Sequence, residues 1–413
     1  MKKTLIRALF VFFALFSVSQ WLFGAEITVP KLEFASRGAA ENGDFTVSTS
    51  AEADIAINGG YKYGITLGLG FEAQNLEKAF SYGRLELPYV SSPPGQAEYN
   101  AMADELNDRY NNQAVLSVRF LEATAREVFG KPLDLSFFAG HYHALGSGDE
   151  FVSRFGTAPV GSSYKGFFYF PEGIGNDPGR RYNGGIHSIF GTGVAAALNL
   201  SDNVVTSFYA YQDLSYRHLY PGEQPGGCFS GDFRLLLNGE KIKLEFFSGG
   251  SYLKDKAPAF HGGLLALFSS GAGFDFLVQG GIPLWRYGEG ISIDNCYFLM
   301  EPRLRMGKAR LHVTFFYHPV YYQNIEETDE QGRADINVKL FFGDVNKTSF
   351  EWGLESTARL QIQNGEDLNM WVSPFISVIT SGLQWNFKIR INPLYFTEGG
   401  NVAEAFIGIR TAY

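Results

Sequence analysis

The sequence predicts an all-β fold: one closed, antiparallel transmembrane β-barrel of about 18 strands. Three observations lead to this prediction, namely the composition, the length of the alternating segments, and the regular exchange of short and long connections between them. Glycine makes up 48 of the 413 residues and aromatic residues 16%, while charged residues reach only 19%, against about 25% in ordinary soluble domains. The two cysteines exclude a disulfide framework and a multi-cysteine metal site.

Residues 1–25 are expected to be a secretory signal peptide. Three basic residues lie within the first seven positions, an apolar stretch covers residues 8–16, and the small residues Gly24 and Ala25 offer a cleavage site. An uncleaved helical anchor is the alternative, but small polar residues follow the apolar stretch, which favours cleavage. The rest of the chain, residues 26–413, then forms a single barrel domain.

The acidic balance of the chain restricts its partners. The formal net charge is -9, and it becomes more negative once the basic leader is removed. Nucleic acids need a basic surface that neutralises their phosphates, so no nucleic-acid partner is expected. The expected partners are the lipids around the barrel and the small solutes inside it.

Long alternating segments distinguish a membrane barrel from a soluble sandwich. Apolar and polar residues alternate through residues 44–57, 350–362 and 383–395. A sandwich also alternates, but its strands average about five or six residues, whereas a tilted strand that crosses a bilayer needs about 9–11. The length of these segments therefore favours a transmembrane barrel.

The connections between these segments alternate between short and long. Asn58-Gly59-Gly60 is a strong tight-turn signal, while the longest connections cover residues 74–111 and 143–185. Short periplasmic turns and long extracellular loops are typical of outer-membrane barrels.

The number of strands depends on the start of the mature chain. Counting back from the C-terminus requires one more strand before residue 44, and residues 26–36 can supply it although Pro30 weakens that assignment. This gives 18 strands. Sixteen is the alternative, if residues 26–36 form a plug or tail and a weak strand such as 263–269 is miscounted.

The C-terminal segment supports a resemblance to bacterial outer-membrane β-barrel proteins of the porin type. Ala405, Ile407, Ile409, Thr411 and Tyr413 share the outward face of the last strand, and the chain ends on the aromatic Tyr413. In that family the terminal aromatic residue, most often Phe, is recognised by the barrel-assembly machinery. The resemblance covers the whole mature chain and implies a location in the bacterial outer membrane.

The late strands place charged residues on the face opposite their apolar residues. Trp352, Leu354, Trp385 and Ile389 are expected to face lipid. The opposite face of a closed barrel lines the lumen, where charge requires water, so a wet channel is implied. The predicted pore-lining residues are Glu301, Arg303, Arg305, His312, Glu351, Glu355, Arg359, Lys388, Arg390 and Arg410.

An 18-stranded barrel is too wide for wall side chains to fill. Its backbone radius is roughly 18 Å, so loops must narrow the bore or leave it open. On our count residues 143–185 form the third external loop. The resemblance to general porins implies that this loop folds inward as a constriction, and an exposed surface loop is the alternative.

Lys388, Arg390 and Arg410 form a basic cluster on the last two strands. A hairpin with residues 395 and 403 opposite each other would place Lys388 beside Arg410. Like charges on neighbouring strands destabilise a sheet. The cluster is therefore expected either to pair with Glu351, Glu355 or Glu404, or to form a positive wall that attracts anions.

The sequence offers little catalytic or metal-binding chemistry. His141 and His143 provide too few ligands for a closed metal site, and the adjacent His187 and Ser188 would point to opposite faces of a strand. No enzyme activity, metal or cofactor is expected. Cys228 and Cys296 could form a loop disulfide or remain two free thiols.

The leading functional prediction is an outer-membrane channel for passive diffusion of small polar solutes through a charged aqueous lumen. One alternative is a plugged uptake channel for hydrophobic substrates such as fatty acids, with residues 26–40 as the plug. Another is a surface adhesin or binding protein that uses its extracellular loops.

Overall fold

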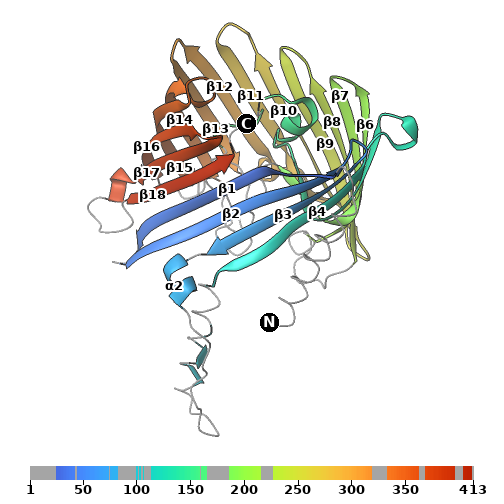
Figure 1. The fold of residues 1–413 in the computed structure, drawn as a ribbon, viewed down its shortest axis with the longest axis horizontal. Coiled ribbons are helices and arrows are strands. Elements are labelled where there is room, and N and C mark those ends of the chain that lie inside the picture. Colours follow the sequence, from blue (N-terminus) through green and yellow to red (C-terminus); the bar gives the residue numbers. More distant parts are fainter. Residues whose placement is uncertain are drawn as a thin grey trace.

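The computed structural model describes residues 25–41, 44–73, 75–81, 99–100, 102–103, 106, 113–158, 160–164, 186–214, 227–318, 333–361, 368–395 and 403–411. Within these ranges the chain forms one barrel-shaped sheet of 18 strands (Figure 1). Each strand pairs antiparallel with the next along the chain, and β1 (Ala25–Glu41) also pairs with β18 (Ala403–Thr411). The prediction of a closed antiparallel barrel with 18 rather than 16 strands is confirmed.

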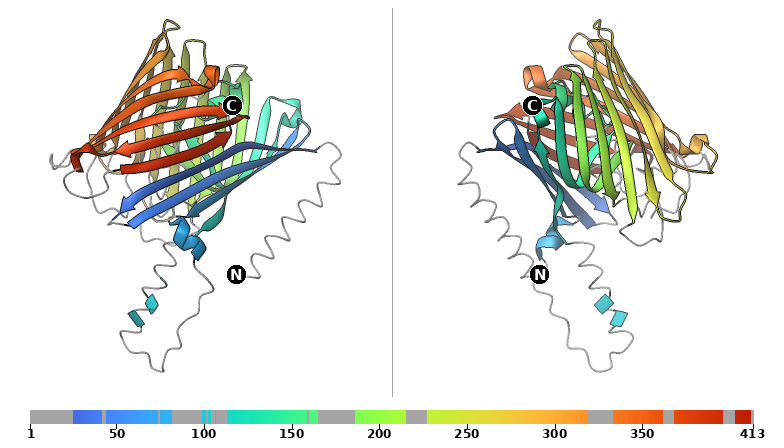
Figure 2. Two further views of the ribbon diagram at one scale, coloured as in Figure 1. Left: turned by 60° about the vertical axis from the view of Figure 1, so that its left-hand side comes forward. Right: turned by 90° about the vertical axis from the view of Figure 1, so that its right-hand side faces the viewer.

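The strands cross the wall obliquely, as Figure 2 shows from two sides. Those between β1 and β18 are β2 (Asp44–Gly59), β3 (Tyr63–Ala73), β4 (Val115–Ala125), β5 (Leu133–Leu145), β6 (His187–Ser201), β7 (Val204–Asp213), β8 (Cys228–Asn238), β9 (Ile242–Leu253), β10 (Ala259–Ser269), β11 (Phe274–Arg286), β12 (Tyr297–Met306), β13 (Ala309–His318), β14 (Arg333–Asp344), β15 (Phe350–Gln361), β16 (Leu368–Thr380) and β17 (Leu383–Ile391). Short connections lead into every odd-numbered strand from β3 to β17, as predicted.

Helical elements are short. Those with both ends in the described ranges are α2 (Leu76–Ser81), α4 (Glu150–Phe155), α6 (Val345–Thr348) and the 3-10 turns η1 (Val128–Gly130), η2 (Ile293–Asn295) and η4 (Pro393–Tyr395). None of the helices in the described ranges combines the length and the apolar character that a bilayer crossing requires. The predicted signal peptide up to residue 24, most of the loop at 74–111 and the terminal Tyr413 lie outside the described residues.

The first strand completes the barrel. β1 pairs with β2 from Ala25 to Glu41 and with β18 from Glu33 to Ala39. The register against β2 shifts between Thr28 and Lys31, a gap that contains Pro30. Proline has no backbone N–H to donate to a ladder, so it is accommodated at such an irregularity. Residues 26–40 are therefore part of the wall, and the plug alternative is wrong.

The two faces of the wall have the predicted chemistry. Trp352, Leu354 and Ile389 point outward and are between 46% and 50% exposed in the isolated chain. Glu355 follows Leu354 directly on the same strand and so lies on the opposite face. It points inward and is 3% exposed. This apolar outer surface suits contact with lipid chains.

The predicted register of the last hairpin is wrong by four residues. Lys388 lies opposite Phe406, Arg390 opposite Glu404, and Arg410 opposite Gln384. The ladder begins at Ile391 because Pro393, at the start of η4, cannot donate to it. The strand consequently ends earlier than the alternation suggested, and Lys388 and Arg410 are not neighbours.

Both cysteines are free thiols. Cys228 is buried against Leu253, Ala259 and Leu284, and the Cys296 thiol lies 3.4 Å from the carbonyl oxygen of Ser292. Of the two alternatives, the pair of free thiols is the one that the structure contains.

The main apolar core lies inside the barrel, between the wall and the loop that follows β5. Leu145 at the end of β5 and Phe151, Val160 and Tyr164 of this loop are buried, at 0% to 1% exposure. They share one cluster with inward-facing wall residues, among them Phe247, Leu265, Leu277, Tyr297, Leu299 and Phe316. The described part of the predicted constriction loop, residues 145–158 and 160–164, therefore folds into the barrel and covers the wall from β9 to β13.

Candidate functional site

Two glycines turn the chain inward at the end of β5. Gly146 and Gly148 have φ angles of 73° and 76°, a backbone region that glycine adopts without steric cost. Their N–H groups donate to the two carboxylate oxygens of Glu245 on β9, at 2.8 and 3.0 Å. A buried carboxylate on the wall therefore holds the first turn of the loop.

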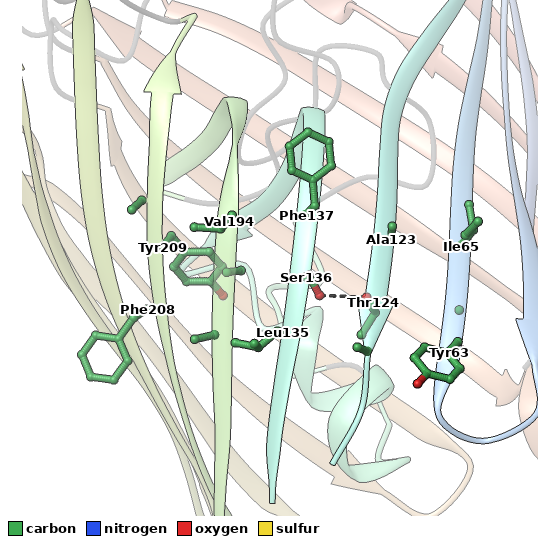
Figure 3. A pocket seen from close by; sticks show the side chains of 15 residues that line it. Tyr63, Ile65, Ala123, Thr124, Leu135, Ser136, Phe137, Val194, Phe208 and Tyr209 are labelled. Carbon is green, nitrogen blue, oxygen red and sulfur yellow. Dashed lines mark hydrogen bonds between the residues drawn. The ribbon is translucent and has the colours of Figure 1, made fainter. Parts of the chain in front are cut away.

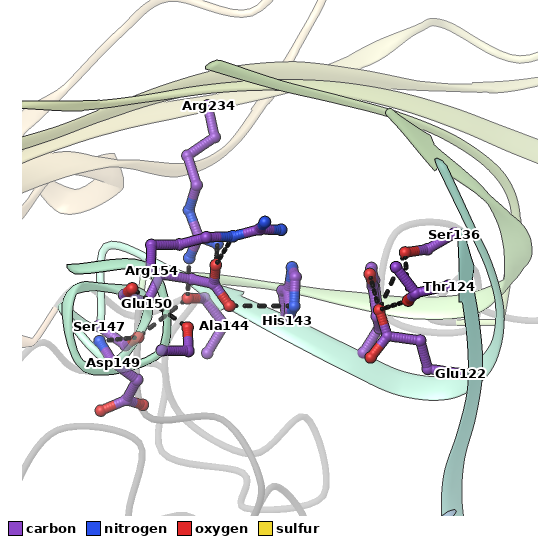
Figure 4. Close-up of polar contacts among 12 residues, drawn as sticks. Glu122, Thr124, Ser136, His143, Ala144, Ser147, Asp149, Glu150, Arg154 and Arg234 are labelled. Carbon is purple, nitrogen blue, oxygen red and sulfur yellow. Dashed lines mark hydrogen bonds and ion pairs between the residues drawn. The ribbon is translucent and has the colours of Figure 1, made fainter. Parts of the chain in front are cut away.

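Arg234 on β8 neutralises this carboxylate. Its Nε donates to Glu245 Oε1 at 2.9 Å, and its side chain is only 1% exposed. A second guanidinium nitrogen donates to the carbonyl oxygen of Ala144 at 2.7 Å, just before the turn (Figure 4). Burying two charges is tolerated only when they are paired and hydrogen-bonded, and both conditions are met here.

Helix α4 continues the same network. Glu150 lies 3.1 Å from His143 Nε2 and accepts a hydrogen bond from Arg154 at 3.2 Å (Figure 4). Arg154 also donates to Asp134 on β5 at 3.1 Å. Burial alone would raise the pKa of the Glu150 carboxyl, but His143, Arg234 and Arg154 around it hold that pKa at about 2. The helix is thus held against the wall by charge as well as by Phe151.

A second anchor lies at the far end of the described loop. Glu301 on β12 accepts hydrogen bonds from Ser162 Oγ at 2.5 Å and from the backbone N–H of Ser163 at 3.0 Å. Arg303 donates to Glu301 at 2.6 Å and to the carbonyl oxygen of Gly161 at 2.8 Å. Glu301 and Arg303 were predicted as pore-lining charges, and the structure places both beneath the loop.

Tyr164 makes the last of these contacts. Its hydroxyl donates to Asp335 Oδ2 on β14 at 2.7 Å. Asp335 is in turn bridged by Arg359 of β15, at 2.9 and 3.1 Å. This contact marks the boundary between the wall that the described loop covers and the charged wall that follows.

On the following strands, single carboxylates are shared by two cations. Glu355 on β15 lies 3.0 Å from Lys388 Nζ and 3.4 Å from Lys339 Nζ. Glu404 on β18 pairs with Arg390 at 3.4 Å and with Arg37 of β1. Lys388 and Arg390 therefore each have a carboxylate partner, as the ion-pair alternative for the basic cluster expects.

Aromatic rings accompany these cations. The guanidinium carbon of Arg390 lies 4.5 Å from the centre of the Trp371 ring, and that of Arg359 lies 5.4 Å from the same ring. Lys339 is 5.0 Å from the centre of the Phe375 ring. Cation–π contacts at these distances hold the long basic side chains along the wall.

The remaining predicted residues are distributed along the inner wall. Arg305 pairs with Asp275 at 2.7 Å but is 56% exposed at the end of β12, and His312 lies 3.9 Å from Glu301. Glu351 pairs with Arg310, and Arg410 donates to Gln384 at 3.0 Å. The structure does not bring the ten residues together as one site.

Several further charged residues face inward and are not among the ten predicted pore-lining residues. Lys339, Arg310, Arg37, Arg119 and Arg234 all contribute to the ion pairs of the inner wall. The alternation in β14, β13, β1, β4 and β8 contains the signal, because each of these residues lies on the polar face of its strand.

A groove on the outside of the barrel has a different character. Figure 3 shows it across β3 to β7, with Tyr63, Ile65, Leu135, Val194 and Phe208 around it. These large side chains are between 39% and 64% exposed, and no charged residue is among those that line the groove. It is part of the apolar outer surface and offers nothing that would orient a polar solute.

No protein-family model matches the chain, and no curated protein matches it. Among solved structures, OccAB2 of Acinetobacter baumannii aligns with a TM-score of 0.51 and 9% identity, over 94% of this chain and 97% of that chain. OpdO of Pseudomonas aeruginosa aligns with a TM-score of 0.49 and 9% identity, over 94% and 96% of the two chains. The alignment with OccAB2 shows a shared barrel fold over nearly the whole chain.

Proposed function

We propose that this chain is a passive channel of a bacterial outer membrane that carries small polar solutes and prefers anions. The observation that supports this most directly is the sharing of Glu355 and Glu404 by two cations each. A wall with an excess of fixed positive charge inside a low-dielectric barrel raises the local concentration of anions.

The inward loop contributes to this function by dividing the bore. Its described residues occupy the side lined by the apolar cluster of β9 to β13. Solutes then pass along the side lined by ion pairs, where the charged groups keep water in the channel. Arg390, beside Trp371, has a planar guanidinium group of the kind that suits carboxylate or phosphate groups.

Planar bilayers containing the purified protein test the proposal. We expect stepwise ohmic conductance and, in a salt gradient, a reversal potential with the sign of anion preference, below the limit of about 59 mV per tenfold gradient for a singly charged ion. The absence of conductance in several lipids and at several voltages would exclude a channel. A reversal potential of cation sign would exclude the anion preference alone.

The export and assembly of the chain are part of the same proposal. Residues 1–25 would be removed as a signal peptide, and the C-terminal strand ending in Tyr413 would be recognised by the barrel-assembly machinery. Deletion of Tyr413 should then lower the amount of folded protein in the outer membrane without lowering the amount exported. Unchanged assembly would argue against recognition of this residue.

A further inference from the structure

A group of two histidines and one aspartate lies on the inner wall at the base of the inward loop. His187 is the first residue of β6, Asp232 belongs to β8 and His261 to β10. One ligand atom from each of the three lies within 4.8 Å of the other two. Neither the ion pairs of the loop anchors nor those of β14 to β18 involve these residues.

The sheet register brings Asp232 and His261 together across one intervening strand. Both lie opposite Gly249 of β9, Asp232 on one side and His261 on the other. A Cβ atom on Gly249 would collide with both Asp232 Oδ1 and His261 Nε2. Glycine at this position therefore creates the space in which the carboxylate and the imidazole meet.

The carboxylate has unused capacity for a ligand. Asp232 is 5% exposed and contacts His261 Nε2 through Oδ1. Its second oxygen, Oδ2, is buried and makes no hydrogen bond of normal geometry within the described part of the chain, although the Tyr211 hydroxyl lies near this carboxylate. An orphaned oxygen on a buried carboxylate costs free energy unless a cation or donor satisfies it.

His187 completes the group and is its most exposed member. Its ring stacks on the ring of His261, with 3.5 Å between the centres and 16° between the planes, and its Nε2 lies 3.4 Å from the Tyr211 hydroxyl. His187 is only partly buried, whereas His261 is 6% exposed. The group is thus enclosed by the wall and accessible at His187.

We infer that His187, Asp232 and His261 bind a divalent transition-metal ion, with Zn²⁺ as the best-suited ion. Two imidazoles and one carboxylate form a donor set that zinc accepts, and they leave a fourth position for water. Calcium and magnesium prefer oxygen donors alone. Tetrahedral ligands about 2.0–2.1 Å from an ion lie roughly 3.4 Å apart. Binding therefore requires Asp232 to move away from His261 and the partly exposed His187 ring to turn out of its stack on His261.

A bound ion would also brace the loop. The backbone N–H of Ile186 donates to the carbonyl oxygen of Leu145 at 2.8 Å, and Leu145 pairs with His187 across β5 and β6. The two ends of the inward loop therefore meet beside His187. An ion bound by His187 of β6, Asp232 of β8 and His261 of β10 would fix the two ends of the loop to the wall on the far side of β7.

The test is metal binding to the purified, folded full-length protein in detergent after removal of metal with a chelator. Calorimetric titration with Zn²⁺ should show one site per chain, and Co²⁺ should give the visible absorption of a low-coordinate site. Mutation of a residue that only hydrogen-bonds to a metal ligand lowers metal affinity about 10–100-fold. His261→Gln and Asp232→Asn remove the ligands themselves, so each should weaken Zn²⁺ binding at least about 100-fold.

His141→Gln is the matched control, because His141 is another histidine of the wall that stacks on an aromatic ring, Phe190, and is not part of the group. Zn²⁺ binding should be unchanged in this variant. If His261→Gln fails to fold, the partly exposed His187→Gln provides the same test.

Failure of the unmodified protein to bind Zn²⁺ or Co²⁺, or equal binding by Asp232→Asn, would overturn the inference. Neither result would bear on conduction, since binding is measured without a membrane potential.

Discussion

Replacement of Glu301 by glutamine should release the far end of the inward loop while leaving the barrel intact. Glu301 is 0% exposed and accepts hydrogen bonds from Ser162, Ser163 and Thr314 as well as from Arg303. Glutamine has nearly the same shape but no charge. It leaves the Arg303 guanidinium, 14% exposed, without a carboxylate partner.

The magnitude follows from the burial of this pair. Breaking a buried ion pair costs about 3–5 kcal/mol. Because glutamine keeps a carbonyl oxygen that can still accept a hydrogen bond, we expect the free energy of loop docking to fall by about 3 kcal/mol. Because three of the groups involved belong to residues 161–163 of the loop, the cost falls on loop docking rather than on the strand ladder. Every 1.4 kcal/mol is a factor of ten, so the open population of this loop segment should rise roughly 100-fold.

Amide hydrogen exchange measures this opening directly, because local unfolding sets the exchange rate of each amide. The Ser163 amide, which donates to Glu301, should exchange roughly 100-fold faster in Glu301→Gln. The amides of Gly146 and Gly148, which donate to Glu245, should be unchanged.

Glu355→Gln is the matched control, because it removes another buried, ion-paired carboxylate. It should leave the exchange rate of the Ser163 amide unchanged. Unchanged exchange at Ser163 in Glu301→Gln, or faster exchange throughout the strands, would refute the reasoning.

Three further predictions concern the wall and the loop. Lys388→Gln with Arg390→Gln should move the reversal potential toward zero, and the shift should shrink at 1 M salt, where the Debye length is about 3 Å; an unchanged potential would remove both residues from the permeation path. Leu354→Arg should lower the stability of the folded protein in lipid vesicles by about 2–4 kcal/mol at the bilayer midplane. Arg305→Gln, which changes an exposed side chain on the inward face, should fold nearly as well as the unmodified protein, and equal tolerance would contradict the face assignment. The pKa of Glu150 is lowered from 4.5 to about 2, so its contribution to the docking of α4 is present above pH 4.5 and is lost as the pH falls toward 2. Fluctuations of the channel current should therefore increase between pH 4.5 and 2. In Glu150→Gln the fluctuations should not depend on pH over this range.

Features that repeat along the chain could be predicted from the sequence. The outward residues of β15 and β17 were identified from a two-residue period, and the strand number from the exchange of short and long connections. These signals depend only on residues that are close in the sequence, so they can be recognised without knowing which strands pair. The same period also identified the inner face, which is why Lys388, Arg390 and Glu355 were placed on it.

Pairings between distant residues could not be predicted. Ser162 and Glu301 are 139 positions apart, and Tyr164 and Asp335 are 171 positions apart, so no local pattern connects them. The predicted register of the last hairpin was wrong for a local reason. The turn η4 shortens β17, and a change in turn length moves the register. The three residues around Gly249 depend on register in the same way, since Asp232 and His261 meet only when two ladders align.

The pairing of β1 with β18 has a consequence for how the protein is made. Until these two strands meet, the growing sheet has two unpaired edges, and exposed edges are sites of aggregation. The strand that closes the sheet is also the last of the eighteen to leave the ribosome. The barrel therefore cannot close before the last of these strands has been made, and until then both edges of the sheet stay unpaired.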